Sequence, residues 1–320
     1  MLQSRNIKHA DQDAIREAAA MIRAGALVAF PTETVYGLGA DARNDRAVAA
    51  IFAAKGRPQF NPLIVHVRDL TAARDLAEFD ALSVQLAQHF WPGPFTLVLP
   101  RRAGCGLSLL VSAGLDTVAL RVPAHPVAQN LLSEADCPIA APSANISGRI
   151  SPTSAAHVAI EFGDKLAMIL DGGACAVGLE SSVVQVRDGK AFLLRPGSVT
   201  RDQIAAIAGT VETGADVPDA PHSPGQLASH YAPKLPLRLN ATMAGPREAA
   251  LAFGDNIPVG AAKICNLSAS GDLSEAAANL FAMLREMDCD KFTGIAVAPV
   301  PMHGLGEAIN DRLIRAAHGR

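Results

Sequence analysis

FPTETVYGLGADA, residues 30–42, is the stretch that decides the fold class, because apolar residues give way here to hydroxyl groups and glycines. The preceding residues 25–30 (GALVAF) include several strand formers, so the polar run begins where a strand leaves a sheet. Open α/β folds bind ligands at such strand ends. A glycine-rich turn capped by a threonine explains the same run equally well. The residues that can bond to a ligand or let it approach closely are Thr32, Glu33, Thr34, Tyr36, Gly37 and Gly39.

Strand and helix patterns alternate along the chain on either side of this stretch. Several predicted strands follow one another without a helix between them, which indicates a mixed sheet. We therefore predict an α/β domain over residues 1–210, with helices on an open, twisted mixed sheet. The predicted helices are 11–25, 45–56, 81–90, 126–134, 154–162 and 201–208, and the predicted strands are 25–30, 62–67, 95–99, 117–122, 139–142, 168–170, 183–186 and 192–194.

A second domain is predicted after a polar segment. Residues 211–236 are rich in proline, glycine, aspartate and serine and have no apolar period, so we predict a linker there. An aromatic residue, Tyr231, in this polar linker suggests that the linker docks onto a surface. Residues 237–320 have a β-α-β-α-β-α pattern, which predicts a small Rossmann-like domain. Its predicted strands are 237–239, 261–265 and 294–300, and its predicted helices lie near Glu248 and at 273–287 and 307–317.

The composition excludes several classes of protein. No apolar run approaches the ~20 residues that span a bilayer, and the first residues lack the apolar segment of a secretion signal, so a cytoplasmic protein is expected. The five cysteines are widely spaced without a C-x-x-C pair, which argues against a disulfide framework or a zinc knuckle. Up to residue 210 there are 19 basic and 19 acidic residues, and 9 and 12 afterwards. Without a basic segment, stable nucleic-acid binding is not expected.

Arg121, inside the apolar strand TVALRV, is the most informative charged residue of the chain. A buried arginine needs an anion. That anion is either an internal carboxylate or the carboxylate or phosphate of a ligand. Lys55 and Arg57 lie at a predicted helix end, where cations also commonly just complement the helix dipole.

Further polar strand exits lie downstream of Arg121. Ser151 before Pro152 is also typical of a helix N-cap, so its hydroxyl could have only a capping role. No phosphate-binding glycine motif, Ser-His-Asp order, catalytic Cys-His pair or close carboxylate pair occurs. Hydroxyls, amides and a few cations without a nucleophile suit phosphoryl or nucleotidyl transfer by positioning and charge stabilisation. The exits are PIAAPSANISGRISPT (138–153), DGG (171–173) with Glu180, Ser181 and Ser182, and LRPGS (194–198).

Taken together, these segments resemble the YrdC-like family in its long two-domain form. The resemblance covers residues 8–236 strongly, whereas 237–320 match mainly by position and β/α pattern. The motifs that carry it, in order, are PTETVYGLG, KGRP with NPLIVHV, WPGPFTLVL, AGLDTVALRVPAHP, PIAAPSANISGRISPT, DGG with GLESSVV, LLRPGS and SPGQLASHYAP.

The resemblance implies an enzyme, a nucleotidyltransferase that joins L-threonine, bicarbonate or CO2, and ATP. Its products would be L-threonylcarbamoyladenylate and pyrophosphate. Downstream proteins would then transfer the threonylcarbamoyl group to the tRNA adenosine next to the anticodon. The resemblance also implies Mg2+ bound with ATP, largely by the phosphates, and no protein ligand for this ion is identified.

Site residues follow from the same resemblance. Arg121 is implied to bind the threonine carboxylate, and Tyr231 of the linker to cover the nucleotide. Lys55, Arg57, Ser143 and Asn145 match the signature quartet of the family and are implied to be catalytic. The implied threonine pocket is Thr34, His66, Arg121 and Ser181. The implied ATP site is Lys55, Arg57, Asn61, Thr117, Ala141, Ser143, Asn145, Ser151, Arg195 and Tyr231.

Some points stay open at this stage. The segment 226–229 (QLAS) departs from the family pattern, so the details of linker docking are not implied, and Glu33 receives no role. The alternative function is a non-catalytic RNA-binding protein of the same fold, against which the even charge balance argues. A carbamoyl-transfer enzyme of related fold, of the kind that matures hydrogenases, would carry zinc-finger segments that this chain lacks.

Overall fold

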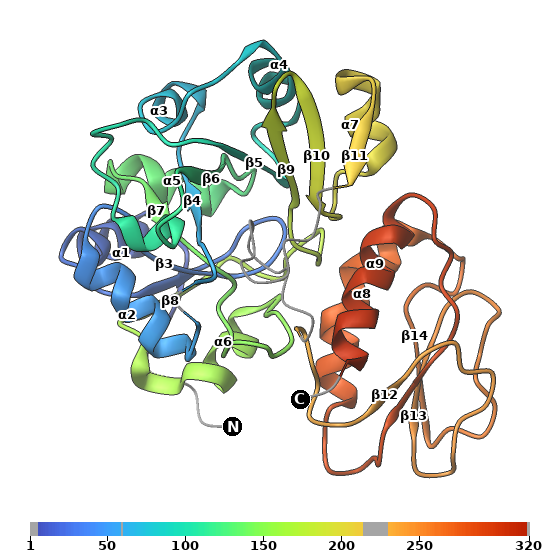
Figure 1. Cartoon of the computed structure of the whole chain (residues 1–320). Coiled ribbons are helices and arrows are strands. Elements are labelled where there is room, and N and C mark those ends of the chain that lie inside the picture. Colours follow the sequence, from blue (N-terminus) through green and yellow to red (C-terminus); the bar gives the residue numbers. More distant parts are fainter. Residues whose placement is uncertain (1–5, 59, 214–229, 319–320) are drawn as a thin grey trace. The chain divides into compact units, whose positions relative to one another are not determined.

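The computed structural model describes residues 6–58, 60–213 and 230–318 in two compact units (Figure 1). The first unit comprises residues 1–147, 152–175 and 180–226, and the second comprises 148–151, 176–179 and 227–320. None of the described helices is long and apolar enough to cross a membrane. The linker segment QLAS, 226–229, which departs from the family pattern, lies outside the described residues.

The first unit is built on a sheet of eleven strands. The sheet is mixed, as predicted, and β1, β3 and β11 are strands that the sequence did not predict. Its strand order is β1-β8-β2-β3-β7-β4-β6-β5-β9-β10-β11. The residues 211–213, at the start of the predicted linker, form β11 beside β10. The strands are β1 Ile7–His9, β2 Val28–Phe30, β3 Gly37–Asp41, β4 Ile64–His66, β5 Phe95–Pro100, β6 Thr117–Arg121, β7 Ile139–Ala140, β8 Met168–Asp171, β9 Ser182–Arg187, β10 Lys190–Arg195 and β11 Val211–Thr213.

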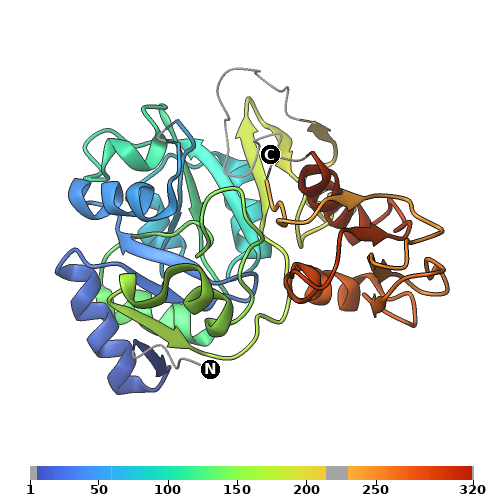
Figure 2. The same cartoon turned by 90° about the horizontal axis from the view of Figure 1, so that it is seen from below.

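Helices lie on both faces of this sheet (Figures 1 and 2). Side chains alternate along each strand, so Val28 and Phe30 of β2 pack against α1 and α5, whereas Ala29 belongs to the core that contains α2, α4 and α6. The helices are α1 Gln12–Arg23, α2 Asp45–Lys55, α3 Leu70–Arg74, α4 Ala81–Phe90, α5 Pro126–Ala135, α6 Ala155–Phe162 and α7 Arg201–Ala208, with short 3-10 turns η1 Leu109–Ser112 and η2 Gly163–Lys165.

The stretch 30–42 is only partly the loop that its polarity suggests. Residues 31–36 form the turn, but Gly37–Asp41 continue as β3, antiparallel to β2. A Cβ atom on Gly39 would lie 2.7 Å from the Phe30 ring, so this glycine is required by packing between the two strands. The turn is therefore held between two paired strands, which fixes its side chains.

The second unit contains a four-stranded parallel sheet of order β12-β15-β13-β14. The predicted helix near Glu248 is wrong, because residues 249–252 (AALA) form the buried strand β13. A run of four small apolar residues is equally compatible with a helix and with a buried strand. In the structure this run is a strand because it pairs in parallel with β14 and β15. The elements are β12 Leu237–Arg238, β13 Ala249–Ala252, β14 Lys263–Asn266, β15 Ile295–Val297, α8 Leu273–Met287 and α9 Leu305–Ala317.

Candidate active site

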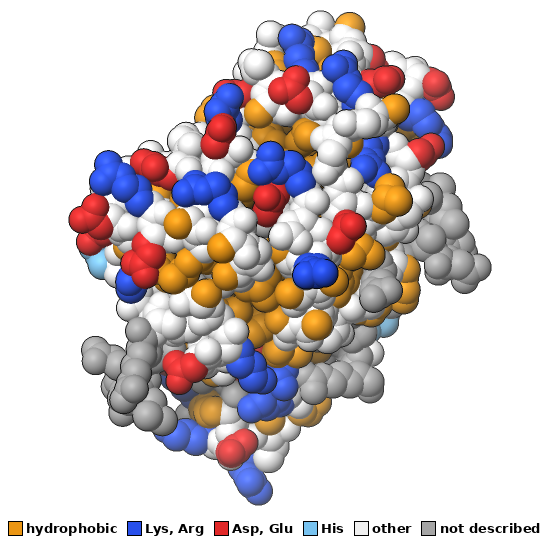
Figure 3. All heavy atoms as spheres, turned by 90° about the vertical axis from the view of Figure 1, so that its left-hand side faces the viewer, with side chains coloured by type: hydrophobic (Ala, Val, Ile, Leu, Met, Phe, Trp, Pro, Cys, Tyr) orange, Lys and Arg blue, Asp and Glu red, His pale blue; other side chains and the backbone are white. Residues whose placement is uncertain are grey.

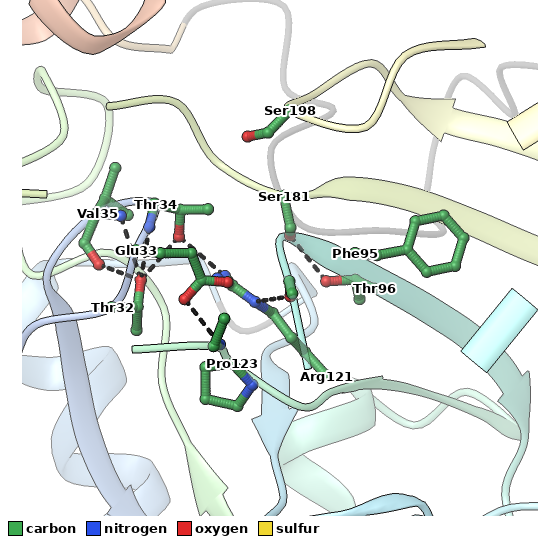
Figure 4. A network of polar contacts seen from close by, with 12 residues as sticks. Thr32, Glu33, Thr34, Val35, Phe95, Thr96, Arg121, Pro123, Ser181 and Ser198 are labelled. Carbon is green, nitrogen blue, oxygen red and sulfur yellow. Dashed lines mark hydrogen bonds and ion pairs between the residues drawn. The ribbon is translucent and has the colours of Figure 1, made fainter. Parts of the chain in front are cut away.

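Arg121 lies at the carboxyl end of β6 and is almost fully buried, with 4% of its surface exposed. Its guanidinium donates to the Gly93 carbonyl at 3.2 Å and to the Thr34 hydroxyl at 2.9 Å (Figure 4). A third bond at 2.7 Å joins it to a Glu33 carboxylate oxygen, forming an ion pair. Of the two anions that the sequence left open, an internal carboxylate is therefore present. Each terminal nitrogen still has an N–H that none of these bonds uses.

Glu33 is the residue that sequence reasoning left without a role. Its second carboxylate oxygen accepts the Ala124 backbone N–H at 3.1 Å. Burial alone would raise the pKa of this carboxyl, but the positive charge and hydrogen bond of Arg121, together with backbone N–H groups, lower it overall. The sequence holds one indirect signal for Glu33: it is a carboxylate at a strand exit, and Arg121, at the end of another strand, needs an anion. Nothing in the local pattern joins the two residues.

His66 ends β4 directly opposite Arg121 in the parallel register. Its ring is buried and packs edge-on to Phe30, with ring centroids 6.2 Å apart. Burial, and then the nearby charge of Arg121, lowers the pKa of His66 to about 3. Among the described residues, Nδ1 of His66 has no hydrogen-bond partner. His66 is thus a neutral group beside the guanidinium, with one ring nitrogen available for a ligand.

The buried neutral state of His66 predicts a pH-dependent stability. The unfolded histidine has a pKa near 6.5 and the folded one near 3, so the unfolded state binds more protons between these values. Stability is then fully present above pH 6.5 and falls as the pH drops, by about 1.4 kcal/mol per pH unit from this group. Urea unfolding of wild type and His66→Gln between pH 7 and pH 4 measures the difference. Equal slopes in the two proteins would contradict the assignment.

Ser181 and Arg195 form a second polar group at the neighbouring strands. The Ser181 hydroxyl lies 2.8 Å from the Thr96 hydroxyl (Figure 4). Arg195, at the end of β10, donates to the Ser181 carbonyl at 2.8 Å and to its hydroxyl at 3.2 Å. A Cβ atom on Gly197 would lie 2.3 Å from the Ser182 nitrogen. The segment LRPGS therefore packs tightly against the backbone of residues 180–182. The structure therefore brings two predicted residues, Ser181 and Arg195, into contact.

Lys55 is buried, with 1% of its surface exposed, and fixes the turn after β7. Its Nζ donates to the carbonyls of Ser143 at 2.6 Å and Asn145 at 2.5 Å. Burial, and then the nearby Arg57, lowers the pKa of Lys55 well below its usual value, while Glu161 opposes this. Three members of the predicted quartet thus meet. Lys55 does more than complement the helix dipole, because it organises a distant loop.

Arg57 and Asn61 lie in the loop between α2 and β4. The Arg57 guanidinium donates to the carbonyls of Asn61 at 3.2 Å and Pro62 at 2.9 Å. The Asn61 side chain is fully buried, yet among the described residues neither its amide oxygen nor its nitrogen has a partner. A buried primary amide without a partner is rare and is typical of a ligand site. Asn61 is therefore placed as a binding residue would be.

Three further predicted residues, Thr117, Ala141 and Ser151, differ in where they lie. Thr117 begins β6, four residues before Arg121, and so lies at the other end of that strand, about 13 Å away. Ala141 follows β7 and donates its N–H to the Ile64 carbonyl at 2.9 Å. Ser151 is not a helix N-cap, because Ser154 caps α6. Ser151 belongs to the second unit, where its carbonyl accepts from Arg285 at 3.3 Å.

Tyr231 is buried within the second unit, with 1% of its surface exposed. Its ring stacks on Phe281 with centroids 5.5 Å apart, and the Arg312 guanidinium lies 5.2 Å from the ring centroid. Its backbone φ is 62°, a value that bulky residues rarely adopt. The packing of its own unit thus holds Tyr231 in a strained conformation, as is common at functional positions.

No cluster of three or more histidine, cysteine, aspartate or glutamate side chains that could hold a metal ion occurs in the described part of the chain. The site described above consists of cations, hydroxyls and amides with one carboxylate. On the face shown in Figure 3, Lys and Arg side chains are interspersed with Asp and Glu. This face carries no separate basic area of the kind that binds RNA nonspecifically.

Comparison with known proteins covers almost the whole chain. Residues 20–197 match a family model described as "Telomere recombination", for Sua5, YciO and YrdC proteins, and residues 199–318 match "Threonylcarbamoyl-AMP synthase, C-terminal domain". The threonylcarbamoyl-AMP synthase of Bacillus subtilis is 42% identical over 96% of this chain and 93% of that protein. The enzyme of the same name from Pyrococcus abyssi is 42% identical over 95% and 94%. A crystal structure of P. abyssi Sua5 complexed with L-threonine superposes with a TM-score of 0.89 at 38% identity, covering 98% and 96% of the two chains.

Proposed function

Because this chain belongs to the Sua5/YrdC family of threonylcarbamoyl-AMP synthases, we propose that its site makes L-threonylcarbamoyladenylate from L-threonine, bicarbonate or CO2, and ATP. Pyrophosphate is the second product, and the reaction is a nucleotidyl transfer. The adenylate supplies the threonylcarbamoyl group for the tRNA adenosine next to the anticodon.

The observation that carries the proposal is the preformed guanidinium of Arg121. It is fixed by Gly93, Thr34 and Glu33 and keeps an unused N–H on each terminal nitrogen. Such a fork suits the two oxygens of an amino-acid carboxylate. Thr34, His66 and Ser181 would complete the threonine pocket, with neutral His66 offering a ring nitrogen rather than a charge.

On the nucleotide side, the site acts by positioning and charge stabilisation. The neutral amine of threonine adds to CO2, and a carbamate oxygen then attacks the α-phosphorus of ATP while pyrophosphate leaves. Arg195 and Arg57 would stabilise charge on the phosphate oxygens, and Asn61 offers a buried amide to the nucleotide. Lys55 would act by holding the turn of Ser143 and Asn145 in place. Mg2+ bound through the ATP phosphates would supply further charge neutralisation.

The proposal also concerns the surroundings of the reaction. The reaction would take place in the cytoplasm, where ATP and tRNA are present, and separate proteins would carry the threonylcarbamoyl group to tRNA. Neither step requires this chain to bind nucleic acid stably, in keeping with its even charge balance up to residue 210.

The proposed reaction predicts threonine-dependent release of pyrophosphate. Purified protein is incubated with ATP, Mg2+, labelled bicarbonate and L-threonine, and pyrophosphate and labelled adenylate are followed together. We expect both to appear in equal amounts and only with L-threonine present. Pyrophosphate release that does not depend on threonine, or its complete absence, would refute the proposed function.

A further inference from the structure

Glu33 and Arg121 present two opposite charges side by side in the proposed threonine pocket. Their nearest atoms are 2.7 Å apart. The Glu33 carboxylate accepts hydrogen bonds from Arg121, from the Ala124 N–H and from its own backbone N–H. A carboxylate has about four lone-pair sites, so it can accept a further donor. Its side chain is 11% exposed, whereas that of Arg121 is 4% exposed. The Glu33 carboxylate can therefore accept a further hydrogen bond, and the Arg121 guanidinium can donate one.

The titratable groups around this pair carry no charge near neutral pH. Burial lowers the pKa of His66 to about 3 and raises the pKa of the Cys175 thiol to about 12. Burial also lowers the pKa of His125 from its usual value, with Glu33 opposing. The field in this part of the site is thus set mainly by one positive and one negative group, Arg121 and Glu33.

We propose that Glu33 binds the α-ammonium group of the amino acid while Arg121 binds its carboxylate, so that the pair selects a zwitterion over a simple carboxylic acid. This inference rests on the proposed function. In an α-amino acid one carbon separates the ammonium from the carboxylate. This close spacing matches the Glu33 carboxylate and the Arg121 guanidinium, which lie side by side. A carboxylic acid without the amine would meet Arg121 but would be repelled by Glu33.

Glu33 acts in this proposal through binding and not as a base. Its lowered pKa makes it a poor acceptor for the proton that the amine must lose before it adds to CO2. The carboxylate of Glu33 accepts hydrogen bonds from the amine both as the ammonium and after the amine has lost its proton, so it contributes uniform binding. Its loss should therefore raise KM for threonine and leave kcat nearly unchanged.

The experiment compares two ligands on the full chain. Wild type and Glu33→Gln are titrated calorimetrically with L-threonine and with 3-hydroxybutanoate, which lacks only the amine. We expect Glu33→Gln to bind threonine about 10-fold more weakly and to bind 3-hydroxybutanoate equally well or more tightly. In turnover, KM for threonine should rise about 10-fold while kcat changes less than about threefold. The control Asp41→Asn, which removes the Asp41 to Arg43 ion pair at the far end of β3, should change neither affinity.

The outcomes separate the inference from the proposed function. If Glu33→Gln lowers the affinity for L-threonine and for 3-hydroxybutanoate by the same factor, Glu33 only orients Arg121. That result would overturn the inference. If Glu33→Gln does not fold, Glu33→Asp is used, which keeps the charge but withdraws it by one methylene. Its preference for threonine over 3-hydroxybutanoate should fall, and an unchanged preference would overturn the inference. If wild type binds no threonine, the proposed function itself fails.

Discussion

Arg121→Ala is expected to lower kcat/KM for threonine about 1,000-fold, equivalent to about 4 kcal/mol of binding in the transition state. The reason is that the variant loses the only side chain of the proposed pocket that offers two N–H groups to a carboxylate. The same change should lower the free energy of unfolding by about 3 to 5 kcal/mol, because Glu33 stays buried without its cation. Threonine titrations of initial rate and urea unfolding measure the two effects.

A double variant separates the two roles of Arg121. Arg121→Ala with Glu33→Ala removes the uncompensated carboxylate, so stability should recover relative to the single variant while threonine binding does not. Arg121→Lys keeps a positive charge but not the planar fork, and should recover only a small part of the threonine affinity. An Arg121→Ala enzyme with unchanged threonine dependence would refute the role of this residue.

Lys55→Met is expected to lower turnover about 100-fold and to reduce the free energy of unfolding by about 3 kcal/mol. The methionine fills a similar volume but leaves the carbonyls of Ser143 and Asn145 without their buried donor. The turn would then move away from the nucleotide, so KM for ATP should rise more than KM for threonine. Steady-state kinetics with each substrate varied in turn measures this difference.

The matched control for Lys55→Met is Lys8→Met. Lys8 is exposed and forms a surface ion pair with Glu17, so its loss should change stability by less than about 1 kcal/mol and leave turnover as in wild type. If Lys55→Met keeps wild-type KM for ATP while losing stability, the lysine serves the fold alone.

Local pattern was sufficient for most of the first unit and less so for the second. Strands such as 95–99 and 183–186 have clear apolar character and were predicted close to their observed bounds. The stretch 37–41 was not predicted as a strand, because GLGAD has few strand formers and becomes one through pairing with β2. The strand 249–252 was missed because four small apolar residues carry no period that distinguishes strand from helix.

The candidate site shows the same division between local and long-range information. Arg121 could be recognised as needing an anion, since a charge in an apolar strand is informative by itself. Its partner Glu33 is 88 residues away, and no local pattern connects the two. Likewise, Lys55 contacts carbonyls 88 and 90 residues further on. Contacts of this kind depend on sheet order, which the spacing of residues does not encode.

The contact between Arg195 and Ser181 has a thermodynamic consequence for the two substrates. In the proposed site Arg195 faces the nucleotide and Ser181 faces threonine, yet the same guanidinium bonds to both the carbonyl and the hydroxyl of Ser181. A nucleotide that draws Arg195 toward its phosphates must then alter the free energy of threonine binding. Linkage requires the effect to be reciprocal, so threonine must change the affinity for ATP by the same factor. ATP and L-threonine would thus influence each other's binding through Arg195, although only ATP contacts this side chain.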